Sequence, residues 1–427
     1  MESLSTDCVI AGGGPAGMMC ALLLARAGVD VIVLEKHGDF LRDFRGDTVH
    51  PSTLDVIAEL GVLDKFLARP HTEVRDISVE IGKESFVAGD FTHLPTRCKF
   101  IALMPQWDFL DFLLGEAEHY DNFRLKMQAE VTDLLAKGGR IAGVLAKTPD
   151  GLCEIRAKLV IGADGRHSTV RAKANMKIKE FGAPFDVLWM RLPYAQGDPK
   201  EPVARFQGGD FFIMLYRGDY WQCAFVIPKG AFGAMKAEGL TGFRARLRSI
   251  AGFARERVEA IQSFDDVRLL TVRVDRLERW ARRGLLCIGD AAHAMSPVGG
   301  VGINLAIQDA VATANILAPV LKKRVPRLSD LDKVQRRRLF PTRVVQRFQV
   351  IVQNRVLAPN LRARQTPKPP FILRLMSRWP WLRRIPARFI GMGVRPEHVS
   401  RSILSSPVYG GGAEHSEAEG APSVTRD

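Results

Sequence analysis

Paired cysteines and long apolar runs are what this sequence of 427 residues lacks. Its six cysteines are scattered without a C-x-x-C pair, which argues against a disulfide framework and against a zinc site. No stretch of about 18 uninterrupted apolar residues occurs, which argues against a membrane-spanning helix. Residues 1–7 contain no Lys or Arg, so no signal peptide is expected. Together these absences predict a globular protein of a reducing compartment, the cytoplasm.

Acidic residues are scarce towards the C-terminus. From Val320 to Arg401 the sequence has 21 Lys and Arg against three acids, although the whole chain has a net charge of +14. No motif that reads nucleic acid accompanies this basic segment, so we expect no nucleic-acid partner. Within residues 366–405, tryptophan and aliphatic residues alternate with arginines. Two interpretations stay open: a peripheral contact with the cytoplasmic membrane face, or a helical cap with solvated arginines.

A glycine-rich turn joins an apolar strand to a helix near the N-terminus. The strand at residues 8–11 is followed by Gly12, Gly14 and Gly17 in the spacing G-x-G-x-x-G. In such a turn the first glycine permits the bend, the second lets backbone approach a pyrophosphate, and the third lets the helix pack closely on the strand. The next strand ends in Glu35, where an acid can accept ribose hydroxyls. This pattern predicts a dinucleotide-binding fold.

Two later segments are apolar strands that end in an acid and a glycine. One ends in Asp164-Gly165 and the other in Gly289-Asp290, and the glycines at 299–302 precede a further helix. In these three motifs and their order, residues 6–320 resemble the flavin-dependent aromatic hydroxylase family, whose members share the p-hydroxybenzoate hydroxylase fold. The resemblance implies FAD as the cofactor and NAD(P)H as a transient co-substrate.

The resemblance also implies a set of site residues. Cofactor contacts are expected at Gly12, Gly14, Pro15, Ala16, Gly17, Glu35, Lys36, Arg45, Gln106, Asp164, Gly165, Gly289, Asp290, Pro297, Gly300, Val301, Gly302, Ile303 and Asn304. The surroundings of the flavin ring are expected at Pro297, Gly299 and Gly300, with neither an acid–base dyad nor a metal. His50 is expected near the flavin end with an open role, and His293 is expected to be structural.

Strand and helix patterns predict an α/β fold in several parts. Residues 1–73, 97–180 and 265–320 form an FAD-binding, Rossmann-like three-layer domain, and residues 74–96 and 181–264 form an inserted β-rich substrate domain. Residues 321–404 form a basic helical region, and residues 405–427 form a disordered tail. A helix over residues 54–60 is expected to be capped by Ser52 or Thr53.

The substrate pocket is expected on the β-rich sheet. Its candidate residues are Phe206, Phe212, Met214, Tyr216, Trp221 and Phe225, facing the loop at 297–302. A pocket rich in aromatic residues and without an obvious paired cation predicts a lipophilic substrate, aromatic or polyene.

A single dinucleotide fold and the lack of a redox-active cysteine pair argue against a flavoprotein disulfide reductase. The resemblance implies a monooxygenase that uses NAD(P)H and O2 to hydroxylate or epoxidise its substrate through a flavin C4a-hydroperoxide. Two alternatives stay open. The chain could be an FAD-dependent reductase of isoprenoid double bonds, or a non-catalytic FAD-binding module that acts at a membrane surface.

Overall fold

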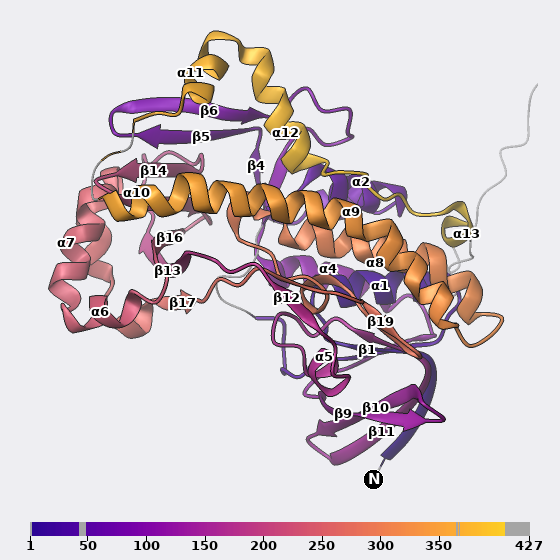
Figure 1. The fold of residues 1–427 in the computed structure, drawn as a ribbon. Helices are drawn as coiled ribbons and strands as arrows, with labels where there is room; N and C mark the ends of the chain where they lie inside the picture. Colours follow the sequence, from indigo (N-terminus) through magenta and orange to yellow (C-terminus); the bar gives the residue numbers. More distant parts are fainter. Residues whose placement is uncertain (1, 42–47, 364–365, 367, 406–427) are drawn as a thin grey trace, which may run out of the picture.

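The computed structural model describes residues 2–41, 48–363, 366 and 368–405. An eight-stranded mixed sheet contains the motif-bearing strands (Figure 1). Its order is β19 (Ala281–Arg282), β20 (Leu285–Cys287), β11 (Gly151–Gly162), β1 (Glu2–Ala11), β2 (Val31–Leu34) and β8 (Phe123–Lys126), with β10 (Arg140–Thr148) paired to β11 and β9 (Glu130–Lys137) paired to β10. β2 is buried along its whole length, as expected of a parallel strand covered on both faces.

Three helices form the main helical packing beside this sheet. α1 (Pro15–Arg26) packs against α8 (Gly302–Leu321), β2 and α4 (Gln106–Ala117). Residues 298–321 are long and apolar enough to cross a membrane, but 83% of the apolar window is buried inside the protein. This stretch is therefore a core helix of the fold.

A seven-stranded sheet forms the second layer of the molecule. Its order is β17 (Arg268–Leu270), β13 (Phe185–Pro193), β16 (Tyr220–Pro228), β15 (Asp210–Tyr216), β14 (Val203–Gln207), β5 (Asp76–Ile81) and β6 (Glu84–Asp90). Six of these strands come from the predicted insertions, whereas β17 lies beyond the predicted boundary at residue 264 and pairs with β13. β13 pairs with β16 on one side and with β17 on the other, so the sheet includes residues beyond the predicted boundary.

Both faces of the seven-stranded sheet are covered. One face packs on α6 (Phe232–Ala237), α7 (Leu240–Ile250) and the 3-10 helix Gly252–Ala260. The opposite face, which we call the inner face, packs on Val298, on the π-helical turn Gln353–Leu357 and on α10 (Ala358–Ala363). The inner face is therefore the one that looks towards the loop at 297–302.

The described C-terminal region consists of helices and the segments that connect them. α9 (Leu328–Val352) runs along the molecule beside both sheets and continues through the π-helical turn (Figure 1). The chain then forms α11 (Phe371–Arg378), the 3-10 helix Pro380–Arg383, α12 (Arg384–Gly391) and α13 (Arg401–Leu404). The predicted disordered tail lies outside the described residues, apart from Ser405.

Short elements connect these layers. They are the small sheet of β3 (Thr48–Val49), β7 (Ile101–Leu103) and β4 (Thr72–Val74), the pair β12 (Ile178–Glu180) and β18 (Asp275–Leu277), and the helices α2 (Pro51–Glu59), α3 (Leu63–Leu67) and α5 (Thr169–Lys173). The predicted cap of α2 is wrong: His50 is the N-cap residue, and Pro51 opens the helix. Proline suits that first position because its φ is already helical and its missing N–H would have no partner there.

Candidate active site

The three sequence motifs meet at one edge of the eight-stranded sheet. Ala11 pairs with Leu34 on one side and with Gly162 on the other, and Gly162 pairs in turn with Cys287. Because these strands are parallel, their carboxyl ends lie side by side. The glycine turn, Glu35, the turn at 164–165 and the turn at 289–290 therefore surround one site, where open α/β sheets bind their ligands.

The glycine turn has the shape of a cradle for a pyrophosphate. A Cβ on Gly17 would lie 2.0 Å from the carbonyl oxygen of Gly12, and a Cβ on Gly12, whose φ is +107°, would lie 2.4 Å from the carbonyl oxygen of Ala163. Both positions therefore require glycine. A Cβ on Gly14, by contrast, would meet nothing within 4 Å. The turn is closed against the protein and open outward, at the N-terminus of α1 where anions bind.

Three carboxylates line this edge. Glu35 accepts hydrogen bonds from the backbone N–H groups of Gly13 (2.9 Å) and His37 (3.1 Å), so its carboxylate is oriented towards the glycine turn. Burial raises the pKa of Asp164, and its Oδ1 atom is buried without a hydrogen-bond partner in the described part of the chain. Asp290 is one-third exposed, with Arg166 at 3.5 Å.

These observations fit an FAD molecule. A buried carboxylate oxygen without a partner is costly unless a donor reaches it, and a ligand that carries hydroxyl or N–H groups would supply that donor. The open space beside Gly14 fits a pyrophosphate, and the carboxylates of Glu35 and Asp290 have the chemistry to accept hydrogen bonds from the hydroxyl groups that FAD carries. The residues present therefore match the cofactor that the motifs predict.

The loop at 297–302 and the strand β3 are tied together. The hydroxyl of Thr48 donates to the carbonyl of Gly300 (2.8 Å). The side chain of Asn304 accepts from the His50 backbone N–H (2.9 Å) and the Thr53 hydroxyl (2.7 Å) and donates to the Thr48 carbonyl (3.2 Å). The Asn304 side chain therefore joins β3, the start of α2 and the first turn of α8. Pro297 and Gly299 lie on the same loop, and Val301, Gly302 and Ile303 lead into α8.

Sequence reasoning missed the support that α9 gives to this loop. Gln349 accepts a hydrogen bond from the N–H of Ser296 (3.1 Å) and donates to the carbonyls of Ser296 (2.8 Å) and Val298 (2.9 Å). Gln346 donates to the Asp275 and Ala294 carbonyls, and Gln353 to the Gly182 carbonyl. The spacing of these glutamines, three and then four residues apart, places them on one face of the helix. That spacing was the available signal.

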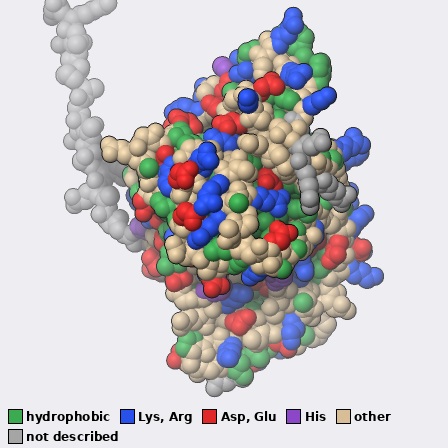
Figure 2. Space-filling model, turned by 90° about the vertical axis from the view of Figure 1, so that its left-hand side faces the viewer, with side chains coloured by type: hydrophobic (Ala, Val, Ile, Leu, Met, Phe, Trp, Pro, Cys, Tyr) green, Lys and Arg blue, Asp and Glu red, His purple; other side chains and the backbone are tan. Residues whose placement is uncertain are grey.

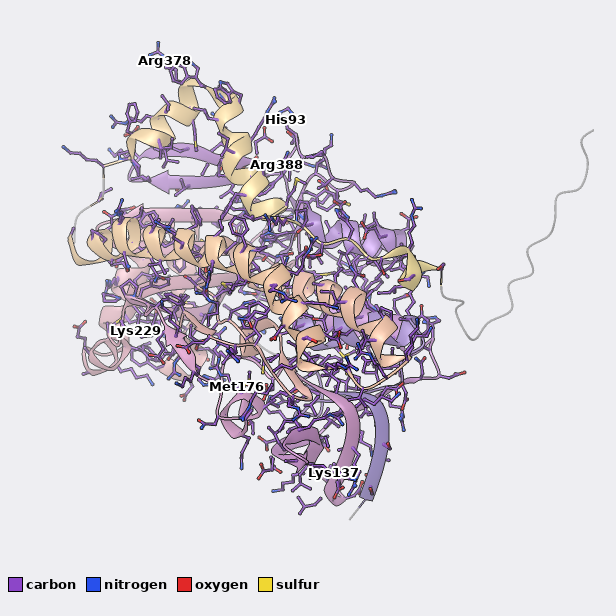
Figure 3. All side chains as sticks on the ribbon, turned by 45° about the vertical axis from the view of Figure 1, so that its right-hand side comes forward. His93, Lys137, Met176, Lys229, Arg378 and Arg388 are labelled. Carbon is purple, nitrogen blue, oxygen red and sulfur yellow. The ribbon has the colours of Figure 1, made fainter. Side chains whose placement is uncertain are left out.

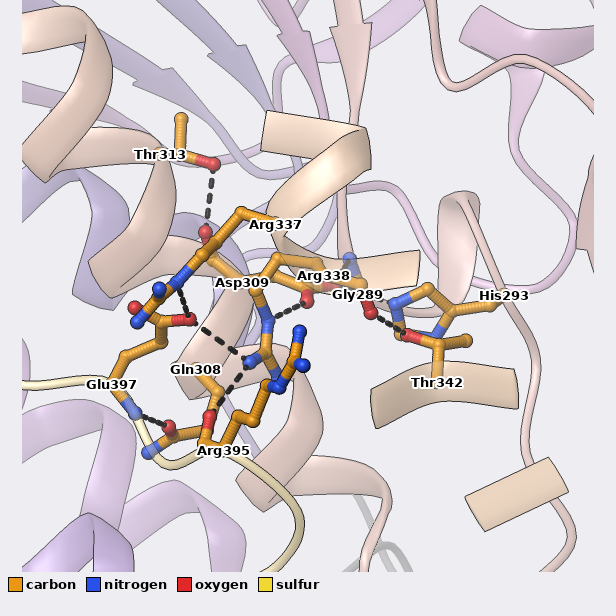
Figure 4. A network of polar contacts seen from close by, with 10 residues as sticks. All are labelled: Gly289, His293, Gln308, Asp309, Thr313, Arg337, Arg338, Thr342, Arg395 and Glu397. Carbon is orange, nitrogen blue, oxygen red and sulfur yellow. Dashed lines mark hydrogen bonds and ion pairs between the residues drawn. The ribbon is translucent and has the colours of Figure 1, made fainter. Parts of the chain in front are cut away.

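A buried ionic network lies behind the turn at 289–290 (Figure 4). Asp309 accepts from the Gly289 N–H (3.1 Å), pairs with His293 Nε2 (2.6 Å) and accepts from Arg338 Nε (2.9 Å). Burial opposes its ionisation, but attraction to His293 and Arg338 outweighs burial and holds the pKa of Asp309 below its ordinary value. Arg338 also reaches Glu397 (3.2 Å). The contact with Asp309 makes His293 part of this buried network.

His50 is wholly buried beside the loop at 297–302. Its Nδ1 lies 2.8 Å from the carbonyl oxygen of Ile390, so Nδ1 carries the proton and donates it. Burial lowers the pKa of His50 to about 4, and the hydrogen bond to Ile390 only partly opposes that shift. His50 is therefore neutral at physiological pH, which suits a positioning role better than a proton-transfer role.

Two further predicted contacts can be placed only by position, and a third cannot be placed. Gln106 is buried as the first residue of α4, beside α1. Lys36 is exposed after β2. Arg45 lies outside the described residues.

Most of the predicted pocket side chains lie on the opposite face of their sheet. Phe212, Met214, Trp221 and Phe225 are fully buried, and with Tyr216 they pack against α6 and α7. Of the predicted set, Phe206 alone lies on the inner face, stacked on Phe211 with ring centroids 3.9 Å apart. The correction has a simple cause: successive strand residues face opposite sides, and both sides are apolar here, so alternation could not tell them apart.

The inner face therefore provides the better candidate for a substrate wall. Its partly buried side chains include Trp189, Phe206, Phe211 and Ile213. They lie in one cluster with Val298 of the loop at 297–302. Partial burial next to that loop leaves aromatic surface for a ligand to cover.

Comparison with known proteins finds similar chains. Residues 5–348 match the family described as FAD binding domain. A 6-methylpretetramide 4-monooxygenase from Streptomyces rimosus is 34% identical over 90% of this chain and 92% of its own length. A rifampicin monooxygenase from Streptomyces venezuelae is 29% identical over 71% of this chain, and the match spans 62% of that relative. The solved structure of OxyS anhydrotetracycline hydroxylase from Streptomyces rimosus shares the fold, with a TM-score of 0.72 at 23% identity over 92% of this chain and 77% of that one.

Proposed function

This chain belongs to the FAD binding domain family, and from that premise we propose that it hydroxylates a polycyclic aromatic compound bound on the inner face of the seven-stranded sheet. It is an oxidoreductase, an FAD-dependent monooxygenase with NAD(P)H and O2 as co-substrates. The similarity to an enzyme named for 6-methylpretetramide, over nearly the whole of both chains, supports an aromatic substrate. It favours an oxygenase over a reductase of isoprenoid double bonds and over a non-catalytic module.

We propose that the strand ends and the loop at 297–302 bind FAD. The N–H groups at the start of α1 hold the pyrophosphate, Glu35 accepts from the adenosine ribose, and Asp290 accepts from the ribityl chain. When bound, FAD supplies the redox chemistry that the side chains lack, taking up hydride from NAD(P)H and activating O2. The N-terminus of α8, behind Gly300, can stabilise negative charge on the reduced ring.

The protein's own residues then orient the substrate and exclude water. Phe206 and Phe211 form a stacked pair that offers a flat apolar surface, and Ile213 and Trp189 extend it towards β13. Aromatic rings stack on such a surface in offset geometry, which holds one ring edge towards the loop at 297–302. This stacked pair beside Val298 is the observation on which the substrate proposal depends.

The test of this proposal compares two neighbours on β15. Phe211→Leu removes half of the stacked pair and should raise KM for a polycyclic probe such as anhydrotetracycline about tenfold, a loss of roughly 1.4 kcal/mol of binding. Phe212→Leu, its control, changes the other face and should lower the unfolding free energy by about 1 to 2 kcal/mol with KM unchanged. Product should carry oxygen from labelled dioxygen. Equal effects of both variants on KM would reject the inner-face pocket.

We further propose a cytoplasmic location, with residues 366–405 in peripheral contact with the cytoplasmic membrane face. What supports this contact is the combination of arginines and exposed apolar side chains in that region. The alternative interpretation, a helical cap, is supported by the burial of Ala387 and Gly391 in α12.

A further inference from the structure

The chain from Phe371 to Gly391 forms a helical hairpin at one end of the molecule, which we call the arginine hairpin. It consists of α11, the 3-10 helix after it and α12, and both helices pack on β6 (Figure 1). Its inner side is tightly seated: a Cβ on Gly391 would lie 2.8 Å from Leu94 and 3.1 Å from Phe91. The hairpin is therefore a fixed part of the fold with one buried side.

The outer side of the arginine hairpin is unusually apolar. Of the 13 large hydrophobic side chains that are exposed in the described residues, five belong to this short segment. Phe371 is 76% exposed, Ile385 62% and Trp381 58%, and Ile372 and Trp379 are each about half exposed. Single exposed apolar residues are ordinary, but a cluster of them marks a surface that binds something.

The same outer side is basic. Arg374, Arg378, Arg384 and Arg388 are exposed, and the sequence from Lys333 to Pro396 contains neither Asp nor Glu. Arg378 extends from the outer end of α11 in Figure 3, and Figure 2 shows Lys or Arg and apolar side chains next to each other on the lobe that carries this hairpin. In the described part of the chain, Arg374, Arg378 and Arg388 form no ion pair.

We propose that the arginine hairpin docks on an anionic phospholipid surface. Aromatic rings at the headgroup level with arginines beside them are the composition of segments that lie in the membrane interface, and the basic charge attracts anionic lipid. An acidic soluble protein would match the charge, but it would not account for three large aromatic side chains pointing into solvent. The proposal deepens the peripheral contact proposed above and rests on it. It does not depend on the oxygenation chemistry.

The inner end of the arginine hairpin contacts residues beside the proposed substrate site. Ile390, on the last turn of α12, accepts the hydrogen bond from His50 beside the loop at 297–302. The same residue packs with Leu215 of β15 and with Val74. A docked hairpin would therefore remain joined to the elements around that site.

Vesicle flotation of the FAD-loaded protein tests the proposal. We expect binding to vesicles of equal parts phosphatidylcholine and phosphatidylglycerol, at least about tenfold weaker binding to phosphatidylcholine alone, and release at high salt as the Debye length shrinks. Tryptophan emission should shift to the blue on binding because Trp379 and Trp381 enter the interface. Equal binding to both vesicle types, or none to either, would overturn the proposal, and capture of an acidic protein in place of lipid would do the same.

Matched variants localise the contact. Trp381→Glu with Ile385→Glu should abolish flotation, whereas Leu152→Glu with Leu269→Glu, at exposed apolar positions elsewhere, should leave it intact. Should the first pair impair folding, Arg374→Ser with Arg378→Ser tests the same surface, and FAD content reports the fold. Unchanged flotation of both hairpin variants would reject this surface. Turnover of a water-soluble aromatic probe should be the same in all variants, so failure of docking and failure of the proposed function are separable.

Discussion

At the residue scale, the site depends on a few positions where the protein itself leaves room or leaves an atom unpaired. Gly12 and Gly17 are confined by backbone, so the fold itself requires glycine there, whereas the space beside Gly14 is empty of protein atoms and is where we propose that the pyrophosphate binds. Asp164 has a buried oxygen that no described residue satisfies. A buried polar atom without a protein partner calls for an explanation, and a bound ligand that donates a hydrogen bond to it is one.

Gly14→Ala separates ligand binding from folding. The added methyl group meets no protein atom, so the unfolding temperature of the FAD-free protein should be unchanged, but the methyl group occupies the space of the pyrophosphate. We expect the Kd for FAD, measured by quenching of flavin fluorescence, to rise by about tenfold or more. Gly115→Ala in α4, where a Cβ also meets nothing within 4 Å, is the control. An unchanged Kd for Gly14→Ala would show that the pyrophosphate lies elsewhere.

Asp309→Asn tests the buried network. Loss of the carboxylate leaves Arg338 buried with a weakened partner, which should lower the unfolding free energy at neutral pH by about 3 to 5 kcal/mol. Because the folded pKa of Asp309 is lowered, its stabilising contribution exists above the unfolded pKa and is lost as the pH falls through the folded value. Urea unfolding should therefore show a smaller difference from the native chain in acid.

The control for the network is an exposed ion pair. Asp133→Asn breaks a bridge to Lys173 whose two side chains are about half exposed, so solvent screening should leave the unfolding free energy almost unchanged at either pH. If Asp309→Asn lowered the unfolding free energy no more than this control does, the buried network would not contribute to stability.

At the element scale, α9 is a basic helix with a buried polar face. Arg338, Gln346 and Gln349 are buried, and Gln349 bonds to the segment at 296–298 that leads into the loop at 297–302. The Gln349 side chain accepts one hydrogen bond from residues 296–298 and donates two to them, so α9 supports the loop of the candidate active site.

Gln349→Leu should loosen that loop. The Ser296 N–H and two carbonyls lose their partner, and each buried group left unpaired costs about 1 to 3 kcal/mol. We expect faster FAD dissociation and faster hydrogen exchange at residues 296–301. Gln335→Leu, which removes a glutamine from the same helix bonded to the backbone of Glu278 and Trp280, should destabilise without changing FAD release. Identical FAD release from both variants would argue against a specific role for Gln349.

At the scale of the whole molecule, three distant parts of the chain meet at the candidate active site. We propose that the strand ends bind the cofactor and that the inner face of the seven-stranded sheet binds the substrate. The C-terminal helices contact both parts and carry the arginine hairpin. The oxygenation and the membrane contact proposed here use separate surfaces, and the hydrogen bond from His50 to Ile390 links them.

The sequence by itself determined where the glycine turns and the carboxylates at the strand ends lie, and it identified FAD as the cofactor. A strand, a glycine turn and a helix are set by local backbone geometry, so the motifs at 12–17, 164–165 and 289–290 could be read in order, and the family followed from them. Only the tertiary structure decided the rest. Both faces of the seven-stranded sheet are apolar and covered, so the residue types do not show which face lies towards the cofactor. That depends on which segments, remote in the sequence, pack on each face, because neighbouring strand residues point to opposite sides. For the same reason the tertiary structure alone decided which side of α9 is buried and which side of the arginine hairpin faces outward, because both depend on packing against remote segments.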